Sequence, residues 1–316
     1  MTASVRAVIV RWRGGDEVRQ CLSSLLGSAG SLLAHVVLVD SGSGDGGAQS
    51  LATDFPDVEV KALAENRGFA FAAGCGAADG EEPLLLLLNP DIDVQAGAVR
   101  ALVDLLESRP RTAGVVPLLT GLDGESQHRW QLRRLPNSMR LSLGLPGASM
   151  FKSPPRSPVG VSQPAAAAWL VRRNVWESLG GLDPTYEPAW WEDVDFCARL
   201  HTRLGAPGFP ADEGFVVQPT AQLLHGGGSS VASLGPEAFF FAYYTNLLRY
   251  TARHHPGRLG FIRKGLRLSL SLRMLLRPTQ REALRTALDA IRTATLSARG
   301  GSLPTTGGRS GAGRRG

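Results

Sequence analysis

Two carboxylates follow directly after a run of five leucines, in the segment Asn89-Pro90-Asp91-Ile92-Asp93. A pair at positions i and i+2 beyond the end of a buried strand can point toward a bound diphosphate. Carboxylate oxygens are hard ligands that suit Mg²⁺ or Mn²⁺, and such a metal neutralises charge on a departing diphosphate. The alternative is a turn in which Asp93 caps the next helix.

A second acidic segment, residues 190–195, reads WWEDVD and combines two tryptophans with three carboxylates. Apolar rings around a carboxylate raise its proton affinity, and they also offer a flat surface to a sugar. This is the setting that a general base for an acceptor hydroxyl requires. The plainer alternative is that the acids only complement the dipole of a helix N-terminus.

Asp40 ends an apolar run and is followed by SGSGDGG. A carboxylate at the carboxyl end of a strand can accept hydrogen bonds from a nucleobase or a ribose hydroxyl, although an ordinary turn explains it equally well. Gly42, Gly44 and Gly47 also match the G-x-G-x-x-G spacing of dinucleotide-binding loops, with Glu65 further along. That fingerprint normally follows the first strand, and this run is the second, so the dinucleotide alternative is disfavoured.

His225 stands before three glycines. An imidazole there can ligate a metal or contact a phosphate, with backbone N–H groups nearby. A lone histidine is more often structural, so both interpretations stay open.

These polar segments lie beside the elements that must position them. Residues 5–12, 35–40 and 83–89 are short apolar runs, as strands buried on both faces are. Helices are predicted between and after them, at residues 16–33, 66–78 and 94–108. Alternating strands and helices predict an α/β fold with a parallel sheet, whose ligands bind beyond the carboxyl ends of the strands.

The remainder of the chain is less regular. Residues 120–164 are rich in Pro, Gly and Ser and predict a long loop or lid with one edge strand. Shorter helices are predicted at residues 173–180, 193–204 and 237–254. In residues 261–296 the leucines from 266 to 272 alternate as in a strand, but the length and the lack of turn residues favour a basic amphipathic helix.

Charge is distributed unevenly. From residue 249 onward there are 15 Lys and Arg and two acidic residues, whereas the first 248 residues hold 19 basic and 26 acidic ones. The basic tail predicts a phosphate-rich partner such as an anionic membrane surface; a solvated Arg-rich appendage is the alternative. Three scattered cysteines, no secretory signal and no membrane-spanning run predict a cytoplasmic protein, peripheral on the inner face of the plasma membrane if bound there.

Five segments, in their order, resemble glycosyltransferase family 2, particularly its bacterial rhamnosyltransferase-like and galactofuranosyltransferase-like members. They are VVLVDSGSGDGG, ENRGFAFAAGCGAA, LLLLNPDID, AWLVRRNVWESLGGLDPTYEPAWWEDVDFCARL and LLHGGGSS. The match runs from about residue 5 to residue 250. Each segment is weak alone, but five in the family's order are specific. The resemblance implies a GT-A type fold, which is a Rossmann-like, mixed, mostly parallel sheet flanked by helices, here with a helical basic tail.

The resemblance also implies inversion at the anomeric carbon by a single displacement. Asp193 then corresponds to the catalytic base and Glu192 to a supporting carboxylate. Trp190 and Trp191 are expected to bind the acceptor.

A divalent metal, Mn²⁺ or Mg²⁺, is the cofactor that the resemblance implies. Its expected ligands are Asp91, Asp93 and His225. The expected contacts to the nucleotide-sugar donor are Trp12, Asp40, Arg67, Gly68 and Asp91.

We therefore expect an enzyme that moves a sugar, rhamnose or another hexose, from a dTDP-, UDP- or GDP-linked donor to a glycan or lipid-linked acceptor in cell-envelope or polysaccharide synthesis. The expected regions are a nucleotide-sugar-binding half at 1–115, an acceptor-binding and catalytic half at 116–235, a basic helical region at 236–296 and a disordered tail at 297–316. An NAD-dependent oxidoreductase, a sugar-1-phosphate nucleotidyltransferase and an inactive sugar-binding protein are the alternatives. No nucleic acid partner is expected.

Overall fold

The leucines of strand β4 (Leu84–Leu88) illustrate how the sequence builds the centre of the molecule. Successive side chains of a strand point to opposite faces. Leu84, Leu86 and Leu88 therefore enter one hydrophobic core, and Leu85 and Leu87 enter another on the opposite face. All five are buried, so truncating one to alanine should cost about 2–5 kcal/mol of stability.

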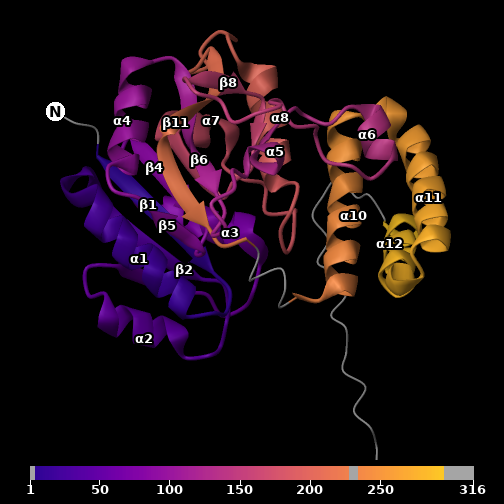
Figure 1. The fold of residues 1–316 in the computed structure, drawn as a ribbon, viewed down its shortest axis with the longest axis horizontal. Coiled ribbons are helices and arrows are strands. Elements are labelled where there is room, and N and C mark those ends of the chain that lie inside the picture. The colour runs from indigo at the N-terminus through magenta and orange to yellow at the C-terminus, as the bar shows by residue number, and fades with distance from the viewer. Residues whose placement is uncertain (1–3, 228–233, 295–316) are drawn as a thin grey trace, which may run out of the picture.

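The computed structural model describes residues 4–227 and 234–294, and Figure 1 shows a twisted sheet with helices packed around it. The other strands of this sheet are β1 (Val5–Arg11), β2 (Leu33–Asp40), β3 (Glu59–Ala62), β5 (Ile92–Val94), β6 (Thr112–Thr120), β8 (Val159–Val161), β10 (Ala168–Arg172) and β11 (Glu213–His225).

The strands lie in the order β3-β2-β1-β4-β10-β6-β11-β5, with β8 beside β11. The pairs β3–β2, β2–β1 and β1–β4 are parallel, and so is the pair β6–β11. Strand β10 is antiparallel between β4 and β6, and β5 and β8 are antiparallel to β11. The predicted α/β class with a mixed, mostly parallel sheet is confirmed.

Helices cover both faces of the sheet. One core forms beneath α1 (Asp16–Ala29), α2 (Gly47–Asp54) and α4 (Ala98–Ser108). The other forms beneath α3 (Gly68–Ala77), α7 (Arg173–Leu179) and α8 (Glu192–Arg203).

A third core holds the C-terminal helices, which are α10 (Pro236–His254), α11 (Leu259–Leu276) and α12 (Arg281–Thr293). Figure 1 shows them together at one side of the sheet, with α10 nearest to it. The predicted single helix over 261–296 is wrong, because the chain turns between α11 and α12 at a 3₁₀ segment, Pro278–Gln280. Proline has no N–H to donate within a helix, which favours a break at this point.

Two long strands, β6 and β11, are not predicted from the sequence. The register of β11 shifts between Gln218 and Gln222, and Pro219 lies in that stretch, so its apolar alternation is interrupted. In residues 120–164 the structure has only short elements besides β8: α5 (His128–Gln131), α6 (Ser138–Ser142) and the pair β7 (Leu132–Arg133) and β9 (Gln163–Pro164). The loop with an edge strand predicted there is therefore largely observed.

The predicted boundaries at 115, 235 and 296 stay predictions, and β6 continues across the first of them. The tail predicted at 297–316 lies outside the described residues. Within the part of the chain that the structure describes, no helix combines the length and hydropathy needed to cross a bilayer.

Candidate active site

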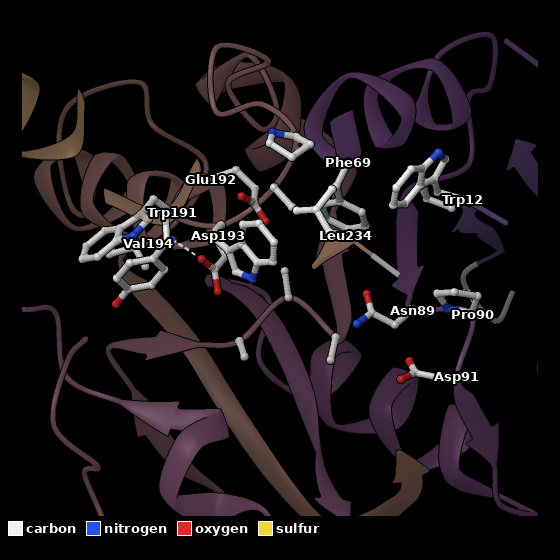
Figure 2. Close-up of a pocket in the computed structure, with 18 of the residues that line it drawn as sticks. Trp12, Phe69, Asn89, Pro90, Asp91, Trp191, Glu192, Asp193, Val194 and Leu234 are labelled. Carbon is white, nitrogen blue, oxygen red and sulfur yellow. Dashed lines mark hydrogen bonds between the residues drawn. The ribbon is translucent and has the colours of Figure 1, made fainter. Parts of the chain in front are cut away.

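A cavity of about 400 Å³ lies beyond the carboxyl ends of β1 and β4, where Trp12 and Asn89 line it. Asp91 lies beside Asn89, and α8 contributes Glu192 and Asp193. Figure 2 shows Asn89 and Asp91 on one side of the cavity and the two α8 carboxylates on the other. The structure therefore brings Asp91 of the NPDID segment to the same cavity as the two α8 carboxylates, whereas Asp93 is not among the described lining residues.

The backbone that leads into α8 is strained. Trp190 and Trp191 have φ of 73° and 80°, in the left-handed region that costs a residue other than glycine about 1–3 kcal/mol. The buried Asn246 of α10 donates from Nδ2 to three carbonyl oxygens of the loop 187–190, at 3.0, 3.1 and 3.2 Å. Helix α10 thus holds the loop that delivers the α8 carboxylates and both tryptophans to the cavity.

Asp193 is nearly buried, and its carboxylate is held by polar neighbours. Nε2 of Gln163 donates to Oδ2 at 3.1 Å, and Nη2 of Arg133 lies 3.7 Å from the same oxygen. The backbone N–H of Val194 donates to Oδ1 at 2.7 Å. Burial raises the pKa of Asp193, and the Arg133 charge opposes that rise. A carboxylate that is more basic than usual, yet has a cation nearby, suits a general base.

Glu192 has a different environment. Its Oε2 is buried and has no hydrogen-bond partner within the described chain. Burial, and after it the negative charge of Asp193, raise the pKa of Glu192 well above its usual 4.5. Adjacent carboxylates whose environments separate their pKa values are typical of acid–base sites. The hydrogen bonds from Gln163 and Val194 and the nearby Arg133 charge stabilise the ionised form of Asp193, whereas the buried Oε2 of Glu192 has no such partner within the described chain.

Asp91 meets His225 on the other side of the cavity, where Nε2 of the imidazole lies 3.5 Å from Oδ1 of the carboxylate. Gln127 fixes the orientation of the imidazole. The amide Nε2 of Gln127 donates to the His225 carbonyl at 3.2 Å. The amide Oε1 of Gln127 lies 2.8 Å from the imidazole Nδ1 and therefore accepts the proton of that nitrogen. The lone pair of Nε2 then faces Asp91. Burial lowers the pKa of His225, although Asp91 opposes this, and the neutral ring is the metal-ligating form.

This pair fits a divalent cation, since a hard carboxylate oxygen and an imidazole nitrogen converge on one point. In the described ranges 4–227 and 234–294 no group of three or more His, Cys, Asp or Glu side chains gathers as a complete site. A cation at Asp91 and His225 would therefore take its remaining ligands from a diphosphate and water.

Asp93 lies away from this pair. It belongs to β5, and its Oδ2 accepts a hydrogen bond from Nε2 of Gln20 on α1 at 3.2 Å. It is not among the described residues that line the cavity. The structure thus places Asp91 at the cavity with His225, and Asp93 against α1.

Asp40, expected to contact the nucleoside, is buried in an ion pair with Arg11. Arg11 also pairs with Asp45 at 2.7 Å, and the backbone N–H of Ser43 donates to Asp40 at 2.8 Å. A Cβ on Gly47 would lie 2.6 Å from the Arg11 guanidinium, so this side chain fills the space beneath the glycine loop. Packing of the loop on an internal cation stands against the dinucleotide-binding alternative.

Gly68 and Arg67, expected to bind the donor, lie at the start of α3. A Cβ on Gly68, whose φ is +85°, would come within 2.8 Å of the Pro188 carbonyl oxygen, so only glycine permits this close approach. The Arg67 guanidinium instead lies 3.8 Å from the centre of the Phe71 ring. Neither is among the described cavity-lining residues, and their donor contacts stay predictions.

Several contributing residues are not predicted from the sequence. Trp130, Arg133 and Tyr243 line the cavity, and Gln127 and Gln163 support it from outside. Four of the five lie within residues 120–164 or at its edge, where no periodic pattern marks them. The only available signal was polar or aromatic side chains within an irregular segment.

Comparison with known proteins is consistent with this geometry. Residues 7–163 match the model of glycosyl transferase family 2, and the chain belongs to this family of glycosyltransferases. Over 318 aligned positions it is 27% identical to the N-acetylglucosaminyl-diphospho-decaprenol L-rhamnosyltransferase of Mycobacterium tuberculosis, covering 92% of this chain and 99% of the relative.

Three solved structures share the fold at low identity. GalNAc-T7, solved with UDP, GalNAc and Mn²⁺, superposes with a TM-score of 0.56 at 16% identity, covering 79% of this chain and 48% of its own. The structure of S. aureus TarS 1–349 superposes with a TM-score of 0.53 at 13% identity, covering 92% of this chain and 80% of its own. The Pyrobaculum calidifontis mannosyltransferase PcManGT, solved with GDP-Man and Mn²⁺, superposes with a TM-score of 0.52 at 16% identity, covering 96% of this chain and 77% of its own. The predicted GT-A type fold is confirmed; this chain spans about half the length of GalNAc-T7.

Proposed function

We propose that this glycosyltransferase is a metal-dependent, inverting enzyme. It moves rhamnose or another hexose from a nucleoside-diphosphate donor to a glycan carried on a lipid diphosphate. The observation that carries the proposal is the single cavity lined by Asp91 and His225 on one side and by Asp193 on the other. The name of the M. tuberculosis relative supports the sugar and the lipid-linked acceptor. The Mn²⁺ and nucleotide complexes of proteins with this fold support the donor class.

Two groups of side chains divide the work. Asp91 and His225 would hold the cation, which when bound neutralises the charge on the departing diphosphate. Asp193 accepts the proton of the acceptor hydroxyl. In the same step the hydroxyl oxygen bonds to the anomeric carbon of the donor sugar, and the bond from that carbon to the diphosphate breaks. Attack from the α8 side, opposite the diphosphate, inverts the anomeric carbon. Glu192 donates a hydrogen bond to the acceptor.

Aromatic side chains complete the acceptor side. Trp190 and Trp191 line the cavity next to the carboxylates, and Tyr243 lies there too, its ring 5.5 Å from that of Trp191. Their faces suit the apolar side of a sugar ring and reduce access of water to Asp193. A lipid-linked acceptor would bring the reaction to the inner face of the plasma membrane.

The test begins with the donor. Thermal unfolding is measured with dTDP-rhamnose, UDP-galactofuranose, UDP-glucose and GDP-mannose, each with Mn²⁺, and the stabilising donor is then incubated with polyprenyl-diphosphate-linked N-acetylglucosamine. We expect transfer that stops in EDTA and returns with Mn²⁺ or Mg²⁺, and a product of inverted anomeric configuration. Full transfer in excess EDTA would remove the metal from the proposal. Donor binding with no transfer to any acceptor would favour a sugar-binding protein.

A further inference from the structure

Helix α11 carries apolar side chains on two opposite faces. On one face Ile262, Leu266 and Leu270 are buried in the third core. The other face exposes a set that we call the α11 stripe: Phe261, Leu268, Leu272, Leu275 and Leu276, which are 57, 73, 54, 71 and 71% exposed. The first four follow one another at intervals of seven, four and three residues, which places them on one side of a helix.

Such a stripe calls for a partner, because a helix on the surface of a monomer normally turns charged or polar side chains to water. The neighbouring α6 adds to the exposed apolar surface with Met139 and Leu143. Ser269 and Arg273 of α11 donate to the Leu143 carbonyl at 3.2 and 2.8 Å, so the two helices lie side by side.

Charge on α11 identifies the kind of partner. The helix has four basic residues and no acidic one. Lys264 and Arg267 are exposed, as is Arg277 directly after the helix. Leucines flanked by cations match an anionic lipid surface, whose acyl chains accept the leucines and whose headgroups accept the cations. A second copy of this chain would instead bring like charges together.

The chain's own C-terminal segment is a poor alternative occupant. Residues 295–316 contain two leucines, Leu296 and Leu303, among Gly, Ser, Thr and Arg. Two leucines cannot cover five exposed apolar side chains, and the arginines would repel α11.

We propose that the α11 stripe inserts into the interface of an anionic bilayer, with Lys264 and Arg267 at the headgroups. The choice of a bilayer rests on the proposed function, because a lipid-linked acceptor lies in a membrane. The sequence predicts membrane contact through the whole basic tail, whereas the contact proposed from the structure is one face of α11. Deleting the tail is an unsuitable test, since α11 and α12 are part of the third core.

Cosedimentation of the full chain with vesicles tests the proposal. The vesicles contain phosphatidylcholine with or without phosphatidylglycerol. The triple variant Leu268→Gln/Leu272→Gln/Leu275→Gln should bind the anionic vesicles at least about tenfold more weakly than the unsubstituted chain. Lys264→Gln/Arg267→Gln should weaken binding by roughly tenfold on anionic vesicles only. Leu122→Gln, at an exposed leucine after β6, is the matched control and should bind normally.

Two results would overturn the proposal. One is vesicle binding that the triple variant leaves unchanged. The other is a dimer, measured by light scattering, that the triple variant converts to a monomer, since the stripe would then be an interface between copies. The thermal unfolding midpoint of each variant, measured without ligand, shows that its fold is intact. If the unsubstituted chain binds vesicles as expected but no nucleotide sugar stabilises it, the proposed function is wrong and the membrane surface stands.

Discussion

Nε2 of His225 lies 3.5 Å from Oδ1 of Asp91, although one residue ends β11 and the other precedes β5. These strands pair antiparallel, with His225 opposite Ile92, which brings the two side chains together. The two glycines after His225 also bond to Asp91. The backbone N–H of Gly226 donates to the Asp91 carbonyl at 2.9 Å, and the backbone N–H of Gly227 donates to Oδ2 of Asp91 at 3.1 Å. Sheet pairing therefore holds together the two side chains that we propose as ligands of the cation.

The first prediction separates the two aspartates of NPDID. Asp91→Asn should lower transfer on the order of a thousandfold, or about 4 kcal/mol, because it removes the negative charge of the proposed cation ligand. Asp93→Asn is the matched control and should stay within about threefold of the unsubstituted chain, because its carboxylate contacts Gln20. Isothermal titration with Mn²⁺ and the donor measures the same contrast without turnover. Equal losses in both variants would restore the aspartate pair.

The second prediction concerns Arg133 and the pH profile. The pKa of Asp193 is raised by burial and pulled back by Arg133, so removing the cation should raise it further. A base works when deprotonated, so Arg133→Gln should move the acid limb of kcat/KM to higher pH. Arg134→Gln, at the exposed neighbour, should leave the limb in place. A lower plateau with an unmoved limb would mean that Arg133 does not act on the base.

The third prediction tests the hold of α10 on the strained loop. Asn246→Ala leaves three loop carbonyls without their donor and should destabilise the fold by about 1–3 kcal/mol. It should also lower kcat, because the loop presents Glu192 and Asp193. Thr245→Ala is the control on the same helix, since its hydroxyl has no hydrogen-bond partner within the described chain. Calorimetry together with kcat measures both effects; a normal kcat at reduced stability would contradict the positioning role.

The fourth prediction concerns acid stability. Burial alone would raise the pKa of Asp195, but the hydrogen bond to His254 at 2.7 Å and the nearby Arg199 and Arg253 bring it below its usual 3.8. A lowered folded-state pKa gives stability that is fully present above 3.8 and lost as the pH falls through the lower folded value.

Asp195→Asn should therefore destabilise the protein by about 3–5 kcal/mol near neutral pH, because it removes the fully buried carboxylate that pairs with Arg199 and Arg253. Its stability should also fall less as the pH drops from about 5 to about 2, the range in which a salt-bridged aspartate takes up its proton. Urea unfolding over this pH series measures the difference. An unchanged acid slope would show that Asp195 does not link the α8 and α10 helices electrostatically.

Elements with a strong local pattern are the ones that can be predicted from the sequence. The leucines of β4 and the helical periodicity of α1 and α4 predict which of their side chains are buried. The carboxylates of NPD and WWED indicate a chemically active site, because carboxylates can bind metals and accept protons. Trp130 and Arg133 give no such signal, because their place in the cavity depends on how an irregular segment folds over the sheet. Asp93 is the opposite case, a residue that the sequence marks as a site residue although it is not among the described cavity-lining residues. It is a carboxylate two residues after Asp91, but its strand pairs with β11 and its side chain contacts Gln20 of α1.

The C-terminal helices show what charge alone does not predict. The basic residues predict one amphipathic helix that faces a membrane, whereas the apolar positions of α11 and α12 mostly build a core with α10. Only contacts between helices distinguish the buried leucines of α11 from the exposed ones, because both sets recur at helical spacing.

The central claim is that Asp193 takes the acceptor proton in the same cavity where Asp91 serves the donor. The most direct measurement compares Asp193→Asn with the unsubstituted chain for both donor affinity with Mn²⁺ and transfer rate. We predict donor affinity within about twofold and a rate lower by about 10²–10⁴, since the side chain keeps its size and loses its basicity. Near-normal transfer by Asp193→Asn would contradict the account.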